Sequence, residues 1–484
     1  MDEFALLQQR LPEAWAANAT GSTTPHVVIA LPSFSLGETI MSHYAPRIPA
    51  LEHRYLLSCL MLPRIPGCDL IFVSCASPAP EVLDYYAGLW PREARSSASG
   101  RLHIVEVPDR SGRSVAIKLL EHPELIEQIR RLIGGRPAMI EPWNVTELEV
   151  ALAEELGVPI NGTAPTLWPL GFKSAGRRLF QRAGVPVALG REDIHDLADV
   201  ASAIAHIRTV HPNATGVVVK HDNSGAGDGN LVIRLTDDQN GTAVRDQLAG
   251  IPAWYVSDLT AGGIVEELVT GEGFSSPSVQ LDISPFGDVT VLSTHEQVLG
   301  GPDDQVYLGC TFPADESYAA ELAEHGRAVG TELAKHGVLG RVGVDFVAVR
   351  NRGSWEVFAL EINLRKGGTT HPFSTLRHLT PGMYDETSGH WRTDGNAGTR
   401  YYRSTDNLVD ETRIGWPARR VIDIVRVAGL NFDPATGTGV VLHMLECLAI
   451  DGRLGLTAIG RSRAEADDLY DAVDAALTAS VARS

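Results

Sequence analysis

Oxygen-bearing side chains gather in two neighbouring apolar stretches, residues 342–347 and 360–365. Asp345 lies in the first stretch, and Glu361, Asn363 and Arg365 alternate along the second. On a β-strand this alternation places the three on one face, so a carboxylate, an amide oxygen and a guanidinium would project into one site. Hard oxygen ligands beside a cation suit Mg²⁺ and phosphate. A hairpin with solvated acidic side chains explains one such strand equally well, so the interpretation depends on the residues upstream.

A second group of residues suits nucleotide phosphates. Lys220 ends the apolar strand 216–220 and precedes a loop that contains Ser224, Gly225, Gly227 and Gly229. An ammonium group at a strand end and glycines that open the backbone can approach the same phosphate oxygens. The loop is not a Walker motif, because GxxxxGK[ST] is absent and the lysine precedes the glycines. We predict that residues 222–230 form a lid, although a mobile surface hairpin is an equally good interpretation of the loop alone.

Two further features fit a nucleotide site. Lys173 opens a helix predicted over residues 173–183, where it could point a second cation at phosphate, although a solvated lysine is the ordinary alternative. Glu266, Glu267, Leu268 and Val269 end a strand before a glycine-containing turn that carries Glu272. Their backbone could hydrogen-bond an adenine edge, and one of the carboxylates could accept from the ribose hydroxyls.

These residues need a scaffold, and the N-terminal third predicts its first layer. The run 26–31 reads as a buried strand, and no GxGxxG follows it. Further strands are predicted at residues 55–59, 70–75 and 102–107, with helices at 123–133 and 145–156. This alternation predicts an α/β layer with parallel strands over residues 25–160.

The remainder of the chain predicts strands around each candidate side chain. They fall at residues 216–220, 231–233, 263–269, 278–283, 289–295, 342–349, 357–363, 439–444 and 454–459. Helices are predicted at residues 173–183, 194–207, 316–336 and 463–479. The stretch 384–406 receives no assignment.

Composition restricts the class of protein. A chain of 484 residues is expected to form two to four structural units. The net charge of −19 and the lack of a dense basic run argue against nucleic acid or an anionic membrane as the main partner. The five cysteines show no CxxC or zinc spacing, which favours reduced core thiols. The N-terminus lacks the apolar run of a signal peptide, so we expect a cytoplasmic protein.

The order of the motifs is more specific than any one of them. The chain has, in this order, a lysine, a strand–lysine–glycine loop, Glu-Glu-Leu-Val, an Asp on a strand and Glu-x-Asn-x-Arg. This order resembles the ATP-grasp superfamily over roughly residues 160–375. The resemblance implies an α/β fold in which two α+β lobes hold ATP. It also implies magnesium bound by an acidic residue and a Glu/Asn pair.

A closer resemblance extends beyond that region. It rests on Pro32-Ser33-Phe34-Ser35, on residues 295–301 (HEQVLGG), on residues 361–372 (EINLRKGGTTHP) and on residues 439–444 (GVVLHM). Together these look like the pheganomycin-type peptide ligases, which carry a Rossmann-like pre-ATP-grasp domain. The implied division is a pre-ATP-grasp domain (1–160), a small lobe with the glycine loop (161–270) and a large lobe with the metal site and C-terminal segment (271–484).

The resemblance assigns roles residue by residue. It gives Lys173, Lys220 and the glycine loop to the phosphates of ATP, and residues 266–269 with Glu272 to adenine and ribose. It gives Asp345, Glu361 and Asn363 to magnesium, as two ions, and Arg365 to the transferred phosphate, with Lys220 as its catalytic partner. Gly367, Gly368, Thr369 and His295 would contact substrate. Many relatives have Glu where this chain has Gly273, so the ribose contact stays open.

The implied reaction joins a small-molecule carboxylate to an amine, amino acid or peptide through an acyl phosphate, with release of ADP and phosphate. His295 and His371 are candidate bases for the amine, but a structural role is the better interpretation of each. A carboxylase-like enzyme that activates bicarbonate is one alternative, although no Met-Lys-Met biotinyl site occurs. A non-catalytic ATP-binding regulator is another. Whether the protein forms a homodimer stays open.

Overall fold

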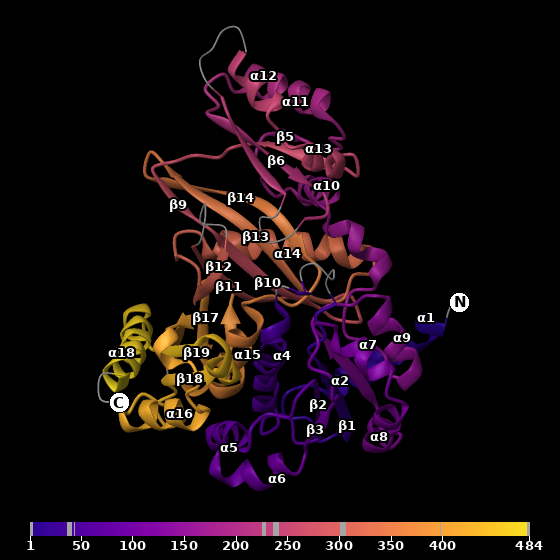
Figure 1. The fold of residues 1–484 in the computed structure, drawn as a ribbon, viewed down its shortest axis with the longest axis vertical. Helices are drawn as coiled ribbons and strands as arrows, with labels where there is room; N and C mark the ends of the chain where they lie inside the picture. Colours follow the sequence, from indigo (N-terminus) through magenta and orange to yellow (C-terminus); the bar gives the residue numbers. More distant parts are fainter. Residues whose placement is uncertain are drawn as a thin grey trace.

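The computed structural model describes residues 3–35, 41–42, 44–224, 229–235, 242–300, 306–396 and 398–481. Figure 1 shows three parts along the long axis. An N-terminal unit and the C-terminal strands share one end, a large sheet lies in the middle, and a small lobe lies at the other end. Among the described residues, no helix is both long and apolar enough to cross a membrane.

The N-terminal unit is the predicted parallel layer. Its strands are β1 (His26–Leu31), β2 (Cys68–Ser74), β3 (Leu102–Glu106) and β4 (Ala138–Pro142). They pair in the order β3-β2-β1-β4, and every pairing is parallel. All six residues of β1 are buried, as expected of a strand covered on both faces. The strand β4 was not predicted.

One strand prediction in this unit is wrong. Residues 55–59 lie within η2 (Arg54–Met61), a 3₁₀ helix. The apolar residues Leu56, Leu57, Leu60 and Met61 recur at helical spacing and are buried, whereas the intervening Tyr55 and Ser58 are half-buried. A short apolar run does not distinguish the two structures by itself, and here the spacing of three to four residues decides for the helix.

Helices cover the parallel sheet. They are α1 (Glu3–Gln8), α2 (Leu11–Ala17), η1 (Ala45–Arg47), α4 (Ile48–His53), α5 (Pro80–Leu89), η3 (Arg92–Ala94), α6 (Arg95–Ser99), α7 (Val115–Leu120), α8 (Pro123–Ile133) and α9 (Glu147–Leu156). The motif after β1 has a structural function at this point: Ser33 Oγ and Ser35 Oγ each donate to Glu149 at 2.5 Å. Glu149 also closes the capping box of α9 with Thr146, so the motif fixes this helix against the strand end.

The small lobe is a four-stranded antiparallel sheet. Its strands are β5 (Gly190–Arg191), β6 (Gly216–His221), β7 (Asn230–Arg234) and β8 (Gly263–Glu267), in the order β5-β8-β6-β7. Its helices are α11 (Leu197–Val210), α12 (Thr242–Ala249) and α13 (Ala253–Leu259). The segment η4 (Pro165–Gly171) and the helix α10 (Lys173–Ala183) connect the lobe to the rest of the chain. The predicted strand–loop–strand around Lys220 is therefore β6 and β7.

The large sheet carries the acidic residues. Its main path is β14 (Ser354–Asn363), β13 (Gly340–Asn351), β10 (Pro277–Ile283), β11 (Val289–Gly300), β12 (Val306–Phe312), β17 (Thr399–Val409), β16 (His390–Thr393) and β15 (Gly382–Asp385). Off this path, β9 (Gly273–Ser275) pairs with β13, and β19 (Arg453–Gly460) pairs with β17 and β18 (Gly439–His443). The unassigned stretch 384–406 thus continues the sheet through β15, β16 and β17.

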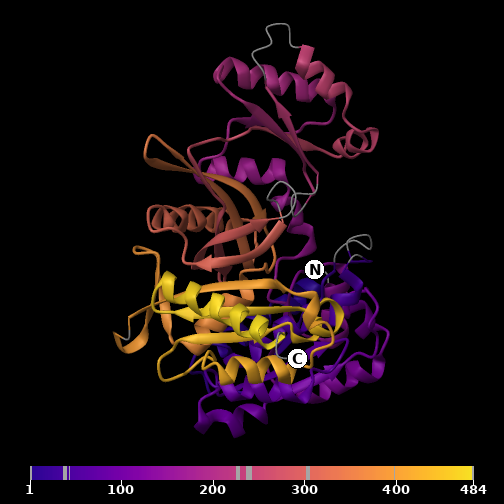
Figure 2. The same ribbon diagram turned by 60° about the vertical axis from the view of Figure 1, so that its left-hand side comes forward.

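The accompanying helices are α14 (Ala319–Lys335), α15 (Thr370–Leu379), α16 (Ala418–Val427), α17 (Leu448–Asp451) and α18 (Arg463–Val481), with the short turns η6 (Asp394–Asn396), η7 (Glu411–Arg413) and η8 (Leu445–Cys447). The C-terminal strands lie against the N-terminal unit (Figure 2), and one hydrophobic core holds residues of both, such as Phe72 and Leu456. Leu442 N donates to Tyr85 Oη at 2.9 Å across this contact. The five cysteines are free and buried, as predicted for core residues.

Candidate active site

A cleft of about 600 Å³ lies between the small lobe and the large sheet. It brings together most of the side chains singled out in the sequence. Those from the small lobe and its connection are Lys173, Lys220, Ser224, Glu266, Glu267, Leu268 and Val269. Those from the large sheet and the loop after it are Asp345, Glu361, Asn363, Arg365, Gly367, Gly368 and Thr369.

Some of the candidates lie elsewhere. Glu272 is exposed and is not among the residues that line the cleft, and neither is Gly229. Gly229 has φ +83, and a Cβ there would lie 2.8 Å from His221 Nδ1, so this end of the loop requires glycine. Gly225 and Gly227 lie outside the described residues, as do the other residues of the predicted lid between positions 225 and 228.

Lys220 points from β6 into the cleft and bonds to a buried carboxylate. Its Nζ donates to Glu266 Oε2 at 2.6 Å, and Arg177 of α10 donates to Glu266 Oε1. Burial alone would raise the pKa of Glu266, but Lys220 and Arg177 hold it below its usual value. Glu266 therefore stays anionic and shares its charge between two cations. Its carboxylate fixes Lys220 and is not free to contact ribose.

Lys173 connects the two sides of the cleft. Its Nζ donates to the carbonyl oxygen of Ser224 at 2.7 Å, at the start of the glycine loop, and lies 3.3 Å from Glu361 Oε2. Asp222 secures the same corner, because Ser174 N and Ser174 Oγ both donate to Asp222 Oδ1 at 2.8 Å. The first turn of α10 thereby positions Lys173 between the phosphate loop and the acidic strand.

The acidic residues face one another across β13 and β14. Asp345 and Glu361 are register partners, and Asn363 pairs with Gly343. The register shifts after Asp345, so Leu360 is an extra residue on β14. Such a bulge turns the strand locally. The predicted common face is confirmed, because Glu361, Asn363 and Arg365 all line the cleft.

Asp345 is buried beside a second carboxylate, and the charge of Arg365 only partly offsets their effect. Burial, and then the charge of Glu361, raises the pKa of Asp345 to about 7. Gln297 Nε2 donates to Asp345 Oδ1 and Asn363 Nδ2 donates to Asp345 Oδ2, both at 2.8 Å. Two close carboxylates and an amide are the hard oxygen donors that Mg²⁺ prefers, once Asn363 turns its amide oxygen inward. These residues fit a magnesium site.

Arg365 and the loop after it form the far end of the cleft. The Arg365 guanidinium lies over the Trp143 ring, 4.9 Å from its centroid. A Cβ on Gly368 would lie 2.5 Å from the Tyr307 ring, so only glycine fits there. Thr369 is the N-cap residue of α15, and the first helical N–H groups follow it. This end of the cleft offers a cation and a helix N-terminus, and both suit an anionic group.

The two histidines considered as bases are buried away from the cleft. His295 is fully buried, its Nε2 is 2.5 Å from Tyr402 Oη, and burial lowers its pKa to about 3. His371 is buried on α15, where its Nε2 donates to Asp406. The structure therefore does not place His295 for substrate contact, and it agrees with the structural interpretation of both residues.

One polar wall of the cleft was not predicted from the sequence. It consists of Ser276, Ser278 and Gln280 from β10 and its approach, Gln297 of β11 and Tyr307 of β12. The period of two along residues 276–280 was the available signal. At the opposite end, apolar side chains form a slot suited to a flat ring: Ala188, Val218, Leu268, Val269, Phe274, Val347 and Leu360.

The chain is similar to two family models and to curated proteins of known name. The family model described as "IQCH-like, ATP-grasp" matches residues 253–386, and the one described as "PGM1 C-terminal domain" matches residues 420–473. The L-propargylglycine–L-glutamate ligase of Streptantibioticus cattleyicolor is 31% identical over 430 residues, which cover 86% of this chain and 87% of that protein. IQ motif-containing protein H of Danio rerio is 25% identical over 61% of this chain, and the match spans a third (33%) of its length.

Solved structures share the fold. Biotin carboxylase from Campylobacter jejuni, in a complex with a nucleotide, aligns with a TM-score of 0.54 at 15% identity over 93% of this chain and 90% of its own. The N5-carboxyaminoimidazole ribonucleotide synthetase from Thermus thermophilus aligns with a TM-score of 0.50 at 13% identity over 92% of this chain and 97% of its own. At these identities the likeness concerns the fold alone.

Proposed function

The chain belongs to the ATP-grasp ligase family that includes the L-propargylglycine–L-glutamate ligase, and on this basis we propose how its cleft carries out ligation. The protein is an ATP-dependent ligase that joins a carboxylate to an amine. The observation that carries the proposal is the meeting of Lys173 and Lys220 with Asp345 and Glu361 in one cleft.

The apolar slot takes the adenine, and the lysines take the phosphates. In the structure Lys220 is bonded to Glu266, and Arg177 keeps that carboxylate paired when Lys220 turns to a phosphate. Lys173 is already bonded to the stem of the glycine loop, so phosphate binding and loop closure share one residue. Residues 222–230 would then cover the reacting groups and keep water from the acyl phosphate.

Asp345, Glu361 and Asn363 would hold magnesium, as two ions. The metal, when bound, neutralises charge on the phosphate oxygens as a Lewis acid. Gln297 orients Asp345 through its 2.8 Å hydrogen bond. Arg365, held over Trp143, faces the phosphate as it leaves ATP for the carboxylate. Its charge reduces the repulsion between the two anions in the transition state.

The amine attacks the acyl carbon, a C–N bond forms, and the C–O bond to phosphate breaks. Gly367, Gly368 and Thr369 leave backbone groups exposed to the acyl phosphate at this point. The ligase relationship, and not the shared fold, favours this reaction over activation of bicarbonate. The retained lysines and carboxylates likewise speak against a regulator without turnover.

The test is a screen of ADP release over a matrix of carboxylates and amines with Mg²⁺, followed by mass detection of the product. We expect ADP release that requires both partners and a product whose mass equals their sum less one water. ADP release without an amide product, or release that requires bicarbonate alone, would overturn the proposal. The two-ion stoichiometry, the domain limits at residues 160 and 270, a homodimer and a cytoplasmic location stay predictions.

A further inference from the structure

A second cavity of about 370 Å³ lies behind the end of the ATP cleft. The segment that runs from Arg365 to Thr370 borders both spaces. Arg365, Gly367, Gly368 and Thr369 line the cleft, whereas Lys366 and Thr370 line the second cavity. Strands of the N-terminal unit, η2 and one face of α15 form the other walls. None of the ATP-binding roles assigned above uses this cavity.

The helix α15 turns a polar face to the cavity. Thr370, His371, Ser374, Arg377 and His378 line it, at the spacing of one side of a helix. Four cationic side chains line the cavity in total, and three of them have a carboxylate partner. Arg54 pairs with Asp406 at 2.5 Å, Lys366 with Glu141 at 2.8 Å, and Arg341 with Asp282 at a longer 3.5 Å.

Arg377 is the surplus cation. Within the part of the chain that the structure describes, its guanidinium forms no ion pair, although the carboxylates of Asp282 and Glu141, which pair with Arg341 and Lys366, act on it at longer range. Arg341 and Arg64 lie near it and add to the positive charge, and burial and these three arginines lower the pKa of His378 well below its usual value. Like charges gathered at the edge of a low-dielectric space repel each other until an anion arrives. This end of the cavity therefore suits an anion.

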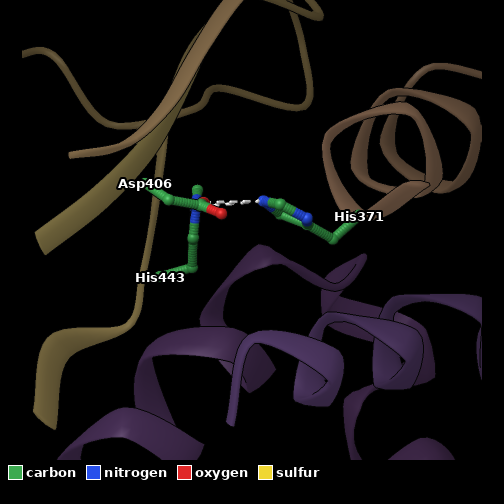
Figure 3. Close-up of side chains that lie close together, drawn as sticks. All are labelled: His371, Asp406 and His443. Carbon is green, nitrogen blue, oxygen red and sulfur yellow. Dashed lines mark hydrogen bonds and ion pairs between the residues drawn. The ribbon is translucent and has the colours of Figure 1, made fainter. Parts of the chain in front are cut away.

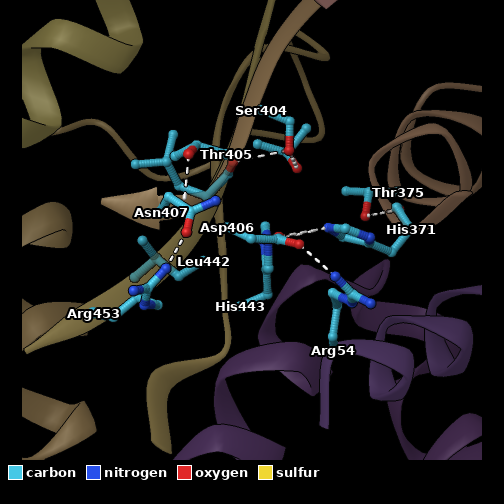
Figure 4. Close-up of polar contacts among 12 residues, drawn as sticks. Arg54, His371, Thr375, Ser404, Thr405, Asp406, Asn407, Leu442, His443 and Arg453 are labelled. Atoms are coloured by element: carbon cyan, nitrogen blue, oxygen red, sulfur yellow. Dashed lines mark hydrogen bonds and ion pairs between the residues drawn. The ribbon is translucent and has the colours of Figure 1, made fainter. Parts of the chain in front are cut away.

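The floor of the cavity is neutral by comparison. His371 and His443 donate from Nε2 to the same Asp406 oxygen, at 3.0 and 2.7 Å. Figure 3 shows the three side chains close together. Arg54 takes the other oxygen of Asp406 (Figure 4). The three ligand-type side chains are close enough to hold a metal ion, but Arg54 already compensates the carboxylate and would repel a cation. Both oxygens of Asp406 are thus paired within this cluster, which leaves Arg377 as the recognition group.

We propose that this cavity binds the carboxylate of the amine co-substrate, with Arg377 and Arg341 as its partners. This inference rests on the proposed ligase function and names the class of acceptor: an amino acid, or a peptide recognised at its C-terminus. A guanidinium pair matches a carboxylate in geometry and charge. The amine end then lies toward the segment Arg365–Thr370, past which it would reach the acyl phosphate in the cleft.

The test compares binding of free L-amino acids, their carboxamides and alanyl-alanine to the full-length protein by calorimetry, with ADP and Mg²⁺ present. We expect at least one free acid to bind at least tenfold more tightly than its amide. Arg377→Met should remove that preference without a change in ADP affinity. The control Arg419→Met removes a 78% exposed arginine on α16 and should change neither. Preference for an amino acid over alanyl-alanine, or the reverse, identifies the kind of acceptor.

A second variant tests the proposal even if Arg377→Met fails to fold. Asp282→Asn removes the carboxylate that competes for Arg341, so it should tighten binding of the same acid severalfold. The proposal is overturned if no acid or dipeptide binds, if acid and amide bind equally, or if Arg377→Met weakens both alike. Because binding is measured without turnover, failure of the ligase function would appear instead as acid binding without any amide product.

Discussion

Arg54 Nη1 donates to Asp406 Oδ2 at 2.5 Å, across 352 positions of sequence. The bond joins η2 of the N-terminal unit to β17 of the C-terminal strands, and both side chains are buried. Asp406 also accepts from His371 and His443, which belong to α15 and β18. Burial would raise the pKa of Asp406, but His371 and Arg54 hold it well below its usual range, so the carboxylate is charged.

The first prediction is that Asp406→Asn destabilises the protein, because it leaves Arg54 as a buried charge without a counterion. Loss of one partner of a buried pair costs about 3–5 kcal/mol. Unfolding in urea, followed by tryptophan fluorescence, measures the change in the free energy of unfolding. Asp423→Asn, in the exposed pair with Arg426, is the control and should change stability little. Equal effects of the two substitutions would contradict the account.

The second prediction concerns the metal ligands. Glu361→Gln should lower turnover at least a hundredfold and raise the Mg²⁺ concentration needed for half-maximal rate, because it removes one charge from the Asp345–Glu361 pair. The matched control is Glu356→Gln on the same strand, whose carboxylate accepts from Asn351 outside the cleft. Steady-state ADP release over a Mg²⁺ series provides both numbers. An unchanged Mg²⁺ requirement would exclude Glu361 as a ligand.

The third prediction separates catalysis from nucleotide binding. If Arg365 acts mainly on the phosphoryl group during its transfer, Arg365→Ala should lower kcat by about 10²–10³ and change ATP affinity less than threefold. Stopped-flow measurement of phosphate release and fluorescence titration with a nucleotide analogue provide the two values. Arg365→Lys should restore little, because the guanidinium stacked on Trp143 has a planar shape that lysine lacks. Unchanged turnover in Arg365→Ala would remove the residue from the mechanism.

The fourth prediction concerns Glu266, the carboxylate that Lys220 shares with Arg177. Lys220→Met should weaken ATP binding by at least tenfold yet leave the fold intact, because Arg177 still neutralises Glu266. Glu266→Gln should instead lower the melting temperature markedly, since it leaves Lys220 and Arg177 without their buried counterion. Lys335→Met, on an exposed part of α14, serves as control for both measurements. Similar melting temperatures for the Lys220 and Glu266 variants would contradict this division.

The fifth prediction concerns stability and pH. Burial raises the pKa of Glu52 to about 7, although Cys75 N donates to its Oε2 at 2.6 Å and Lys118 lies nearby. Because the folded chain keeps this proton after the unfolded chain has lost it, the Glu52 contribution favours folding at low pH and is lost as pH rises from about 4.5 to 7. The loss amounts to at most about 3 kcal/mol.

Glu52→Gln should therefore raise the melting temperature relative to the unchanged protein at pH 8 and leave it nearly equal at pH 5. Differential scanning fluorimetry across pH 5–8 measures the melting temperature of both proteins. The difference between the two removes the contribution of the other titrating groups, because both proteins contain them. Glu81→Gln, on the first turn of α5, is the control. A difference that is constant across the pH range would show that Glu52 does not hold its proton in the folded state.

Local patterns in the sequence predicted much of the fold. The runs around Lys220, Asp345 and Glu361 are strands because each is apolar and bounded by glycine or polar residues. Tyr55 and its neighbours were assigned to a strand because hydrophobicity alone does not distinguish a short strand from a 3₁₀ helix. The strands β15 to β17 were not predicted, because their stability comes from pairing with distant partners such as β12 and β19.

The same distinction applies to the site. Residues with a charge at the end of an apolar run, such as Lys220, were found by type and spacing. Gln297 and Arg377 were not found, because an isolated polar residue gains its meaning only from what the fold places opposite it: Asp345 for Gln297, and a set of arginines for Arg377. The network around Asp406 draws on four separate elements, so sequence spacing does not indicate it.

Lys220 and the acidic pair of the cleft belong to two different sheets. Lys220 belongs to the small lobe, whereas Asp345 and Glu361 belong to a sheet that continues without a break into the C-terminal strands. Between them, Lys173 at the start of α10 lies 3.3 Å from Glu361. Under the proposed function, the polyphosphate of ATP would lie between Lys220 and this acidic pair, so that nucleotide binding would link the two sheets as well as supply the reactant.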